Sequence, residues 1–170
     1  MPFNIEIKAR TTRQAAIRDW LLAQGADFRG TDLQKDTYFH CTNGRLKLRQ
    51  GSIENNLIFY RRPDQEGPKG SEVNLANVSS GPEMELLLQQ ALGVWKVVEK
   101  SREIYFIENV KFHLDRLAGL GEFVEIEAID ADGSVGETRL RAQCDHYMEA
   151  FGIQPADLLS GSYSDMVSGT

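Results

Sequence analysis

The amino-acid sequence predicts an α+β fold in which a mostly antiparallel sheet carries helices on its outer side. Eight short segments alternate apolar and polar residues, as β-strands do when their two faces meet different surroundings. Three longer segments place apolar residues at helical spacing. Short turn-like pieces such as CTNG and IENN join several of the strand segments, and such connections suit antiparallel neighbours.

The predicted strands cover residues 3–10, 34–40, 44–50, 55–62, 71–78, 97–107, 110–117 and 122–129. In the first of them Ile5 and Ile7 share one face, whereas Asn4, Glu6 and Lys8 share the other. Such a strand belongs either to a surface with its charges in water or to a barrel with its charges inside.

The predicted helices cover residues 12–24, 82–92 and 135–151. The first ends near Gly25, and the second begins with Pro82 and stops before Gly93. The third follows a capping box formed by Ser134 and Glu137. Residues 61–71, rich in Gly, Pro and charge, are predicted to form a mobile loop. Within that loop Lys69 is expected to be solvated, although a loop lysine can close over a bound phosphate chain.

The composition is that of a globular protein with a single domain over residues 1–170, since 41% of the residues are apolar and 26% are charged. No apolar run is long enough to span a bilayer and no signal-peptide pattern begins the chain, so we expect a cytoplasmic protein without a membrane partner. The net charge of −6 argues against a nucleic-acid partner. Cys41 and Cys144 are too few for a zinc cluster or a disulfide framework.

Charges of one sign gather on single strand faces, and this leaves two interpretations of the sheet open. The groups are Arg45, Lys47 and Arg49; Lys100 and Arg102; and Glu125 and Glu127. A sheet with one solvated face commonly shows such alternation. A closed barrel with its polar faces inward also explains it, because eight strands suffice for closure, and closure removes exposed edges.

An inward arrangement would bring complementary chemistry together. The carboxylates of Glu125 and Glu127 would emerge about 7 Å apart on one side of a strand, where Glu6 could join them. Such oxygens suit Mg²⁺ or Mn²⁺, which also take water and phosphate oxygens. The cations would repel one another unless a polyanion filled the space, and a triphosphate bridged to metal would neutralise both groups. His40, His113 and His146 show no ligand spacing, and His113 is expected to be a packed barrel residue rather than a general base.

Six segments, in this order, resemble the CYTH superfamily, whose members are also called triphosphate tunnel metalloenzymes. They are NIEIKAR, DTYF, GRLKLR, LIFYRR, KSREIY and HLDRLAGLGEFVEIE. The resemblance runs from residue 4 to about residue 166 and, with the C-terminal SYSDMV, is closest to the class IV adenylate cyclase (CyaB-like) branch. It implies an eight-stranded antiparallel closed barrel with helices packed outside, whose tunnel binds a triphosphate with a divalent metal. Asn4, Glu6 and Lys8 would then face the tunnel.

The resemblance also implies roles for residues at matching positions. Glu6, Lys8 and Asp115 would be catalytic, and Glu6, Asp115, Glu125 and Glu127 would hold Mg²⁺ or Mn²⁺. The phosphate-binding cations would be Lys8, Lys47, Arg49, Arg61, Lys100 and Arg102, with Lys69 of the predicted loop as a further candidate. Asn4 stands where the family signature has its first Glu, so a second metal would be held weakly or not at all.

The expected activity is that of a class IV adenylate cyclase, in which the ribose 3′-hydroxyl attacks the α-phosphorus of ATP and pyrophosphate leaves. A triphosphatase that hydrolyses inorganic, thiamine or nucleoside triphosphate is the alternative, and both reactions use the same cations and metal. A non-catalytic binder of nucleotide or polyphosphate is a third interpretation. The expected partner is therefore a small-molecule triphosphate, and related cyclases suggest a homodimer.

Overall fold

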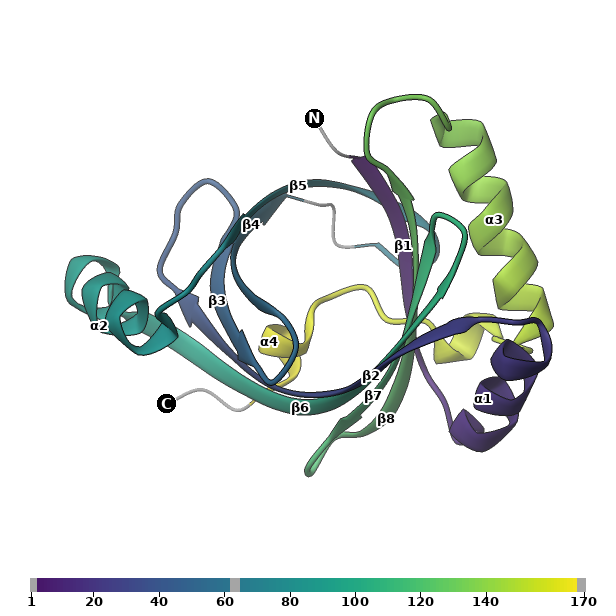
Figure 1. Cartoon of the computed structure of the whole chain (residues 1–170), viewed down its shortest axis with the longest axis horizontal. Coiled ribbons are helices and arrows are strands. Elements are labelled where there is room, and N and C mark those ends of the chain that lie inside the picture. The colour runs from purple at the N-terminus through teal and green to yellow at the C-terminus, as the bar shows by residue number, and fades with distance from the viewer. Residues whose placement is uncertain (1–2, 62–64, 168–170) are drawn as a thin grey trace.

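The computed structural model describes residues 3–61 and 65–167, and its eight strands form a closed barrel. They are β1 (Phe3–Arg10), β2 (Asp27–Phe39), β3 (Arg45–Gly51), β4 (Asn55–Arg61), β5 (Lys69–Asn77), β6 (Val94–Ile107), β7 (Val110–Leu117) and β8 (Gly121–Asp130). Every neighbouring pair is antiparallel, in the order β1-β5-β4-β3-β2-β6-β7-β8, with β8 pairing back to β1 (Figure 1). The closed barrel is confirmed, and the sheet with one solvated face is excluded.

Three helices of the described chain lie outside the barrel wall, and a short fourth lies at its opening. They are α1 (Gln14–Ala23), α2 (Gly81–Leu92), α3 (Glu137–Ala150) and α4 (Tyr163–Met166), with a 3₁₀ turn at Pro155–Asp157. Figure 1 shows α1 and α3 on one side of the barrel, α2 on the opposite side, and α4 across the opening. No helix among the described residues has the length and apolar character needed to cross a bilayer.

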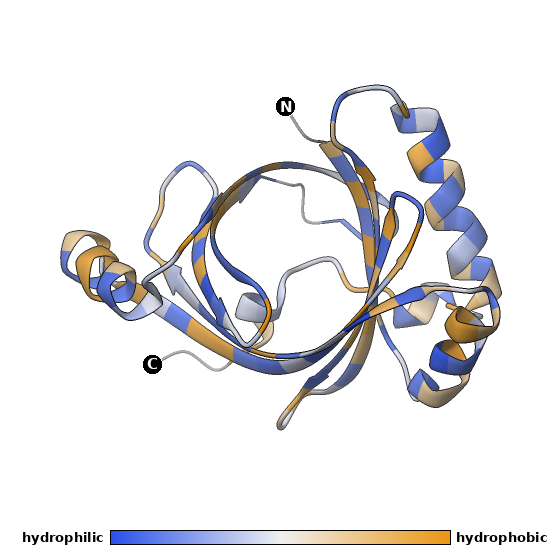
Figure 2. Ribbon diagram, viewed as in Figure 1, coloured by the Kyte–Doolittle hydropathy of each residue, from blue (hydrophilic) through white to orange (hydrophobic). Residues whose placement is uncertain are grey.

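The main core lies between the barrel wall and the two helices α1 and α3. The alternation along the strands, visible as alternating colours in Figure 2, turns one apolar face outward. Ile5 and Ile7 of β1 are fully buried there against Ile17 of α1 and Leu140 of α3. The outward direction of Ile5 and Ile7 fixes the inward direction of their polar neighbours on β1.

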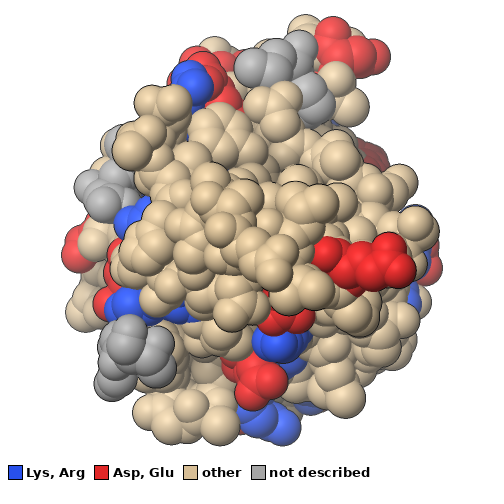
Figure 3. All heavy atoms as spheres, turned by 90° about the vertical axis from the view of Figure 1, so that its left-hand side faces the viewer, with Lys and Arg blue, Asp and Glu red and all other residues tan. Residues whose placement is uncertain are grey.

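The α2 helix covers its side of the barrel less completely. Leu86 and Leu87 of this helix are 57% and 59% exposed. Figure 3, which faces that side of the molecule, shows a broad central area with few charged atoms. Two leucines of this helix are therefore more than half exposed.

Several predicted boundaries differ from the structure. The β2 strand begins at Asp27, well before the predicted start, because its polar first half pairs with β6 through a bulge at Gly30, where φ is +116°. The predicted capping box of α3 is wrong, since its N-cap is Gly136 and Ser134 makes no cap hydrogen bond. Instead, the carboxylate of Asp130 accepts hydrogen bonds from backbone N–H groups of this connection.

The predicted loop over residues 61–71 is also shorter in the structure. Residues 62–64 lie outside the described part of the chain, and β5 already begins at Lys69. Lys69 pairs with Glu6 across the β1–β5 ladder and is 1% exposed, so the expectation of a solvated lysine is wrong.

Candidate functional site

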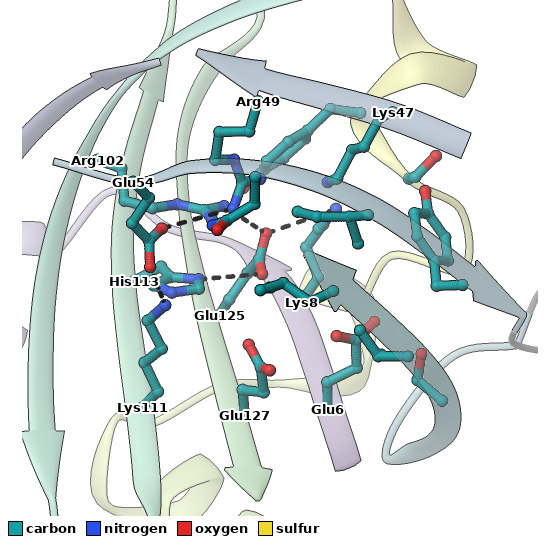
Figure 4. Close-up of a pocket in the computed structure, with 18 of the residues that line it drawn as sticks. Glu6, Lys8, Lys47, Arg49, Glu54, Arg102, Lys111, His113, Glu125 and Glu127 are labelled. Carbon is teal, nitrogen blue, oxygen red and sulfur yellow. Dashed lines mark hydrogen bonds and ion pairs between the residues drawn. The ribbon is translucent and has the colours of Figure 1, made fainter. Parts of the chain in front are cut away.

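A cavity inside the barrel collects inward side chains from all eight strands, and Figure 4 shows its polar lining. The predicted site residues that line it are Glu6, Lys8, Lys47, Arg49, Lys100, Arg102, Glu125 and Glu127. They lie together because each pair is two residues apart on one strand and the apolar residue between them points outward.

Asp115 lies behind this lining rather than in it. It is fully buried, and its two carboxylate oxygens accept hydrogen bonds from Nε and Nη2 of Arg102, each at 2.7 Å. The hydroxyl of Tyr163 donates a third hydrogen bond to Asp115, also at 2.7 Å. The structure thus places Asp115 as the partner that orients Arg102.

Arg61 and Lys69 are not brought to the cavity. Arg61 is exposed at the end of β4, where its Nε donates to the carbonyl of Asn43 at 2.9 Å and its Nη1 lies 3.8 Å from Glu72. Tyr60, its neighbour, is the inward residue there. Lys69 is buried on the same face of β5 as Ser71, but it does not line the cavity, and its Nζ donates to the carbonyl of Ser160 at 2.6 Å.

A buried carboxylate that the sequence interpretation missed, Asp36 of β2, gathers three of the cations. Its oxygens accept two hydrogen bonds from Arg49, at 2.9 and 2.8 Å, and one from Lys100 at 2.7 Å. The Nζ of Lys47 lies 3.4 Å away. Burial opposes ionisation, yet these cations hold the pKa of Asp36 well below its ordinary value. Asp36 therefore stays charged at neutral pH.

Glu125 is the shared carboxylate for two further cations and for the His113 ring. Its carboxylate lies 3.6 Å from Nζ of Lys8, 3.2 Å from Nη2 of Arg102 and 3.3 Å from Nδ1 of His113. The expectation that the inner cations would repel one another without a polyanion is wrong, because buried carboxylates lie among them. A phosphate chain would therefore compete with existing ion pairs.

A third ion pair comes from the turn between β3 and β4. Buried Asp32 accepts hydrogen bonds from the backbone N–H groups of Ile53 and Glu54, at 2.8 and 3.0 Å, and this fixes the turn. Glu54 then points into the cavity, with its carboxylate 2.6 Å from Nζ of Lys111 and 3.5 Å from Arg49. Burial opposes the shift, but Lys111 above all lowers the pKa of Glu54 to about 2. Neither Glu54 nor Lys111 was expected from the sequence.

His113 lines the cavity as well as being packed in the wall. Its Nε2 is buried and has no hydrogen-bond partner among the described residues. Burial, followed by the nearby charge of Arg102, lowers the pKa of His113, so the ring is neutral at neutral pH.

Glu6 and Glu127 are the carboxylates best placed for a metal ion. They are direct partners across the β1–β8 ladder, and both line the cavity. Asn4 donates a hydrogen bond from Nδ2 to Glu127 at 2.7 Å, and its buried Oδ1 has no partner within the described residues. The described residues contain no cluster of three or more His, Cys, Asp or Glu side chains that would form a closed metal site. This donor set fits a hydrated hard cation that takes few protein oxygens and completes its shell with water and phosphate.

A closed barrel that is lined with paired basic and acidic side chains defines a tunnel protein suited to a small polyanion. The sequence model of the CYTH domain matches residues 2–153, and the chain belongs to this family. Members of the family bind triphosphates and depend on metal. No curated protein matches the sequence.

Solved structures share the fold along nearly the whole chain. A protein from Pyrococcus horikoshii is 23% identical, with a TM-score of 0.77 over 97% of this chain and 99% of that one. A candidate adenylate cyclase from Vibrio parahaemolyticus is 18% identical, with a TM-score of 0.77 over 96% and 97% of the two chains. A candidate adenylyl cyclase from Hippeastrum with a dominant triphosphatase activity is 14% identical, with a TM-score of 0.60 over 98% and 93%. These likenesses show the barrel fold.

Proposed function

We propose that this protein is a divalent-metal-dependent enzyme that acts on a triphosphate, with the adenylate cyclase reaction as the first candidate. The observation that carries the proposal is the set of cations on one cavity, beside the carboxylate pair of Glu6 and Glu127. These cations are Lys8, Lys47, Arg49, Lys100, Arg102 and Lys111, contributed by β1, β3, β6 and β7.

The arginines and lysines of the cavity would contribute to phosphate binding in different ways. The planar guanidinium groups of Arg49 and Arg102 are oriented by Asp36 and Asp115, so they meet phosphate oxygens in fixed directions. Burial lowers the pKa of Lys100 to about 7, although Asp36 acts against this. A bound phosphate chain would favour the charged form of Lys100 further. A divalent cation held by Glu6, Glu127 and Asn4 would neutralise charge on the phosphates as they react.

A nucleotide is favoured by the part of the lining that β4 and β5 contribute. Ile58 of β4 and Leu75 of β5 are cross-strand partners, as are Tyr60 and Val73, and all four side chains border the cavity. This contiguous apolar patch suits a base, whereas inorganic triphosphate has no group to place there. In the cyclase reaction the 3′-oxygen of the ribose would form a bond to the α-phosphorus and lose its proton. The bond from that phosphorus to pyrophosphate would break.

A triphosphatase is the second candidate function, supported by the dominant triphosphatase activity of the Hippeastrum neighbour. In that reaction water attacks the terminal phosphorus, and the same cations stabilise the developing charge. A binder without turnover is the third, and it is supported by the neutral Asn4 beside Glu127.

Product analysis separates these activities. Purified protein incubated with ATP and Mg²⁺ or Mn²⁺ is expected to release cyclic AMP and pyrophosphate in equal amounts, and a chelator should stop the reaction. Orthophosphate from ATP, inorganic triphosphate or thiamine triphosphate would instead establish a triphosphatase, and no product from any of them would leave a binder. Arg141→Ala, on the exposed side of α3, is the control and should act as the wild type does.

Asn4→Glu is expected to lower the metal concentration that gives half-maximal activity. The new carboxylate would replace an amide that donates to Glu127, and without metal two like charges would face each other. A divalent cation relieves that repulsion and gains a charged ligand. Metal titration of both proteins at saturating substrate measures the change. An equal or higher metal requirement in the variant would remove position 4 from the metal site, and Asn4→Gln is the neutral control.

A further inference from the structure

The C-terminal segment, Ser160–Val167, forms part of the cavity although it lies beyond the residues that the family model matches. Ser162 and Tyr163 of this segment line the cavity together with residues of the strands. Figure 1 shows the segment, with α4, running across the barrel opening. One end of the tunnel is therefore bounded by residues outside the barrel itself.

Three basic side chains of the barrel fix this segment in place. Lys69 of β5 donates to the carbonyl of Ser160 at 2.6 Å, and Lys96 of β6 donates to the carbonyl of Val167 at 2.6 Å. Between them, Arg45 of β3 donates to the carboxylate of Asp165 at 3.0 Å. The segment is thus tied at both ends and in the middle, so the side chains that it directs inward have defined positions.

Tyr163 is the residue of this segment with the most direct contacts to the site. The Nζ of Lys8 lies 3.6 Å from the centre of its ring, and Phe123 packs against the ring at 5.1 Å between centroids. The hydroxyl donates a hydrogen bond to the carboxylate of Asp115, which also accepts a hydrogen bond from Arg102. Tyr163 is 3% exposed, so its ring is held from three sides.

The contact between the ring and Lys8 has a physical consequence for anion binding. An aromatic face attracts an ammonium group without accepting one of its N–H donors in a conventional hydrogen bond. Burial disfavours the charged form of Lys8, and the ring offsets part of that cost. Besides its ion pair with Glu125, at 3.6 Å, an ammonium that rests on a ring keeps N–H donors available for phosphate oxygens.

We propose that the ring of Tyr163 is a positioning group that holds the ammonium of Lys8 where it receives a phosphate chain, with its hydroxyl fixed by Asp115. This inference rests on the proposed function and adds to it a residue from outside the matched domain. Lys69, Lys96 and Arg45 then serve the site indirectly, by fixing the segment that carries Tyr163.

Calorimetric titration with inorganic triphosphate in metal-free, chelator-containing buffer tests the proposal. Tyr163→Phe keeps the ring and its packing, so its affinity is expected to stay within about threefold of the wild type. Tyr163→Leu loses the ring and is expected to bind about tenfold more weakly than the Phe variant. In a Lys8→Met background the difference between Phe and Leu at position 163 should disappear, because the partner of the ring is gone.

An aromatic ring outside the cavity supplies the control. Tyr147→Leu removes a ring that packs on Phe112, and this variant should bind triphosphate as the wild type does. Circular dichroism checks folding, and Tyr163→Met replaces the Leu variant if the latter does not fold. Equal affinity of the Phe and Leu variants, or a difference that persists without Lys8, would overturn the role of the Tyr163 ring but not the proposed function. Failure of the wild type to bind triphosphate without metal would overturn this inference, and failure to bind any triphosphate with Mg²⁺ present as well would also overturn the proposed function.

Discussion

Replacing Glu127 with glutamine is expected to lower the rate of triphosphate turnover about a hundredfold while the barrel stays intact. Glu127 faces Glu6 across the β1–β8 ladder and borders the cavity, so its charge is available to a metal ion. Glutamine keeps the size and one acceptor oxygen, and Asn4 can still donate to it. The loss therefore falls on charge stabilisation in the transition state rather than on packing.

Turnover at saturating substrate over a series of metal concentrations measures this effect. Glu122→Gln is the matched control, because Glu122 lies on the same strand but pairs with Arg116 on the outside. Turnover at the wild-type rate in Glu127→Gln, at every metal concentration, would remove Glu127 from the metal site. Glu125 is a less clear test, since its carboxylate also holds Lys8 and Arg102.

Replacing Asp36 with asparagine is expected to lower the free energy of unfolding by roughly 3–5 kcal/mol, as is typical when one partner of a buried ion pair is removed. The neutral amide would leave Lys47, Arg49 and Lys100 facing one another without their shared counter-charge. Added inorganic triphosphate should stabilise the variant more than the wild type, because the ligand replaces the missing negative charge.

Urea denaturation at several pH values measures both effects. The pKa of Asp36 is depressed in the folded protein, so its contribution is complete above the unfolded pKa of about 4 and is lost as the pH falls below it. The difference between wild type and variant should therefore shrink in acid. Asp19→Asn, at an exposed position on α1, is the control. A loss below about 1 kcal/mol at neutral pH would mean that the cations need no shared carboxylate.

Alternation along the strands was sufficient to predict which residues share a polar face, but not whether that face lies in water or inside a barrel. In β1 the outward packing of Ile5 and Ile7 places Glu6 and Lys8 inside, as the period of two requires. The same rule also predicts that Asp36 faces inward, because it shares a strand face with Tyr38, which lines the cavity. The family motif predicted that Arg61 binds phosphate. Because Tyr60 faces the cavity, alternation along the strand directs its neighbour Arg61 outward.

Other parts of the candidate site depend on contacts between distant segments, which no local pattern records. Asp115 has the same parity as His113, yet whether it meets a metal or an arginine is decided by Arg102 on the next strand. Lys69 lies in a stretch rich in loop-forming residues, so local sequence predicts a loop there. It belongs to a strand because it pairs with Glu6 of β1. Tyr163 reaches Lys8 from the end of the chain.

The pairing of the first strand with the last also bears on how the chain acquires its site. Asn4 and Glu127 touch across 123 positions of sequence, so their strands meet only after a long loop of chain has been closed. During synthesis β1 emerges first and waits for β8, and no incomplete chain that ends before β8 contains both Glu6 and Glu127. The carboxylate pair therefore exists only once β1 and β8 have paired, and metal-dependent triphosphate binding should not appear during refolding before that pairing.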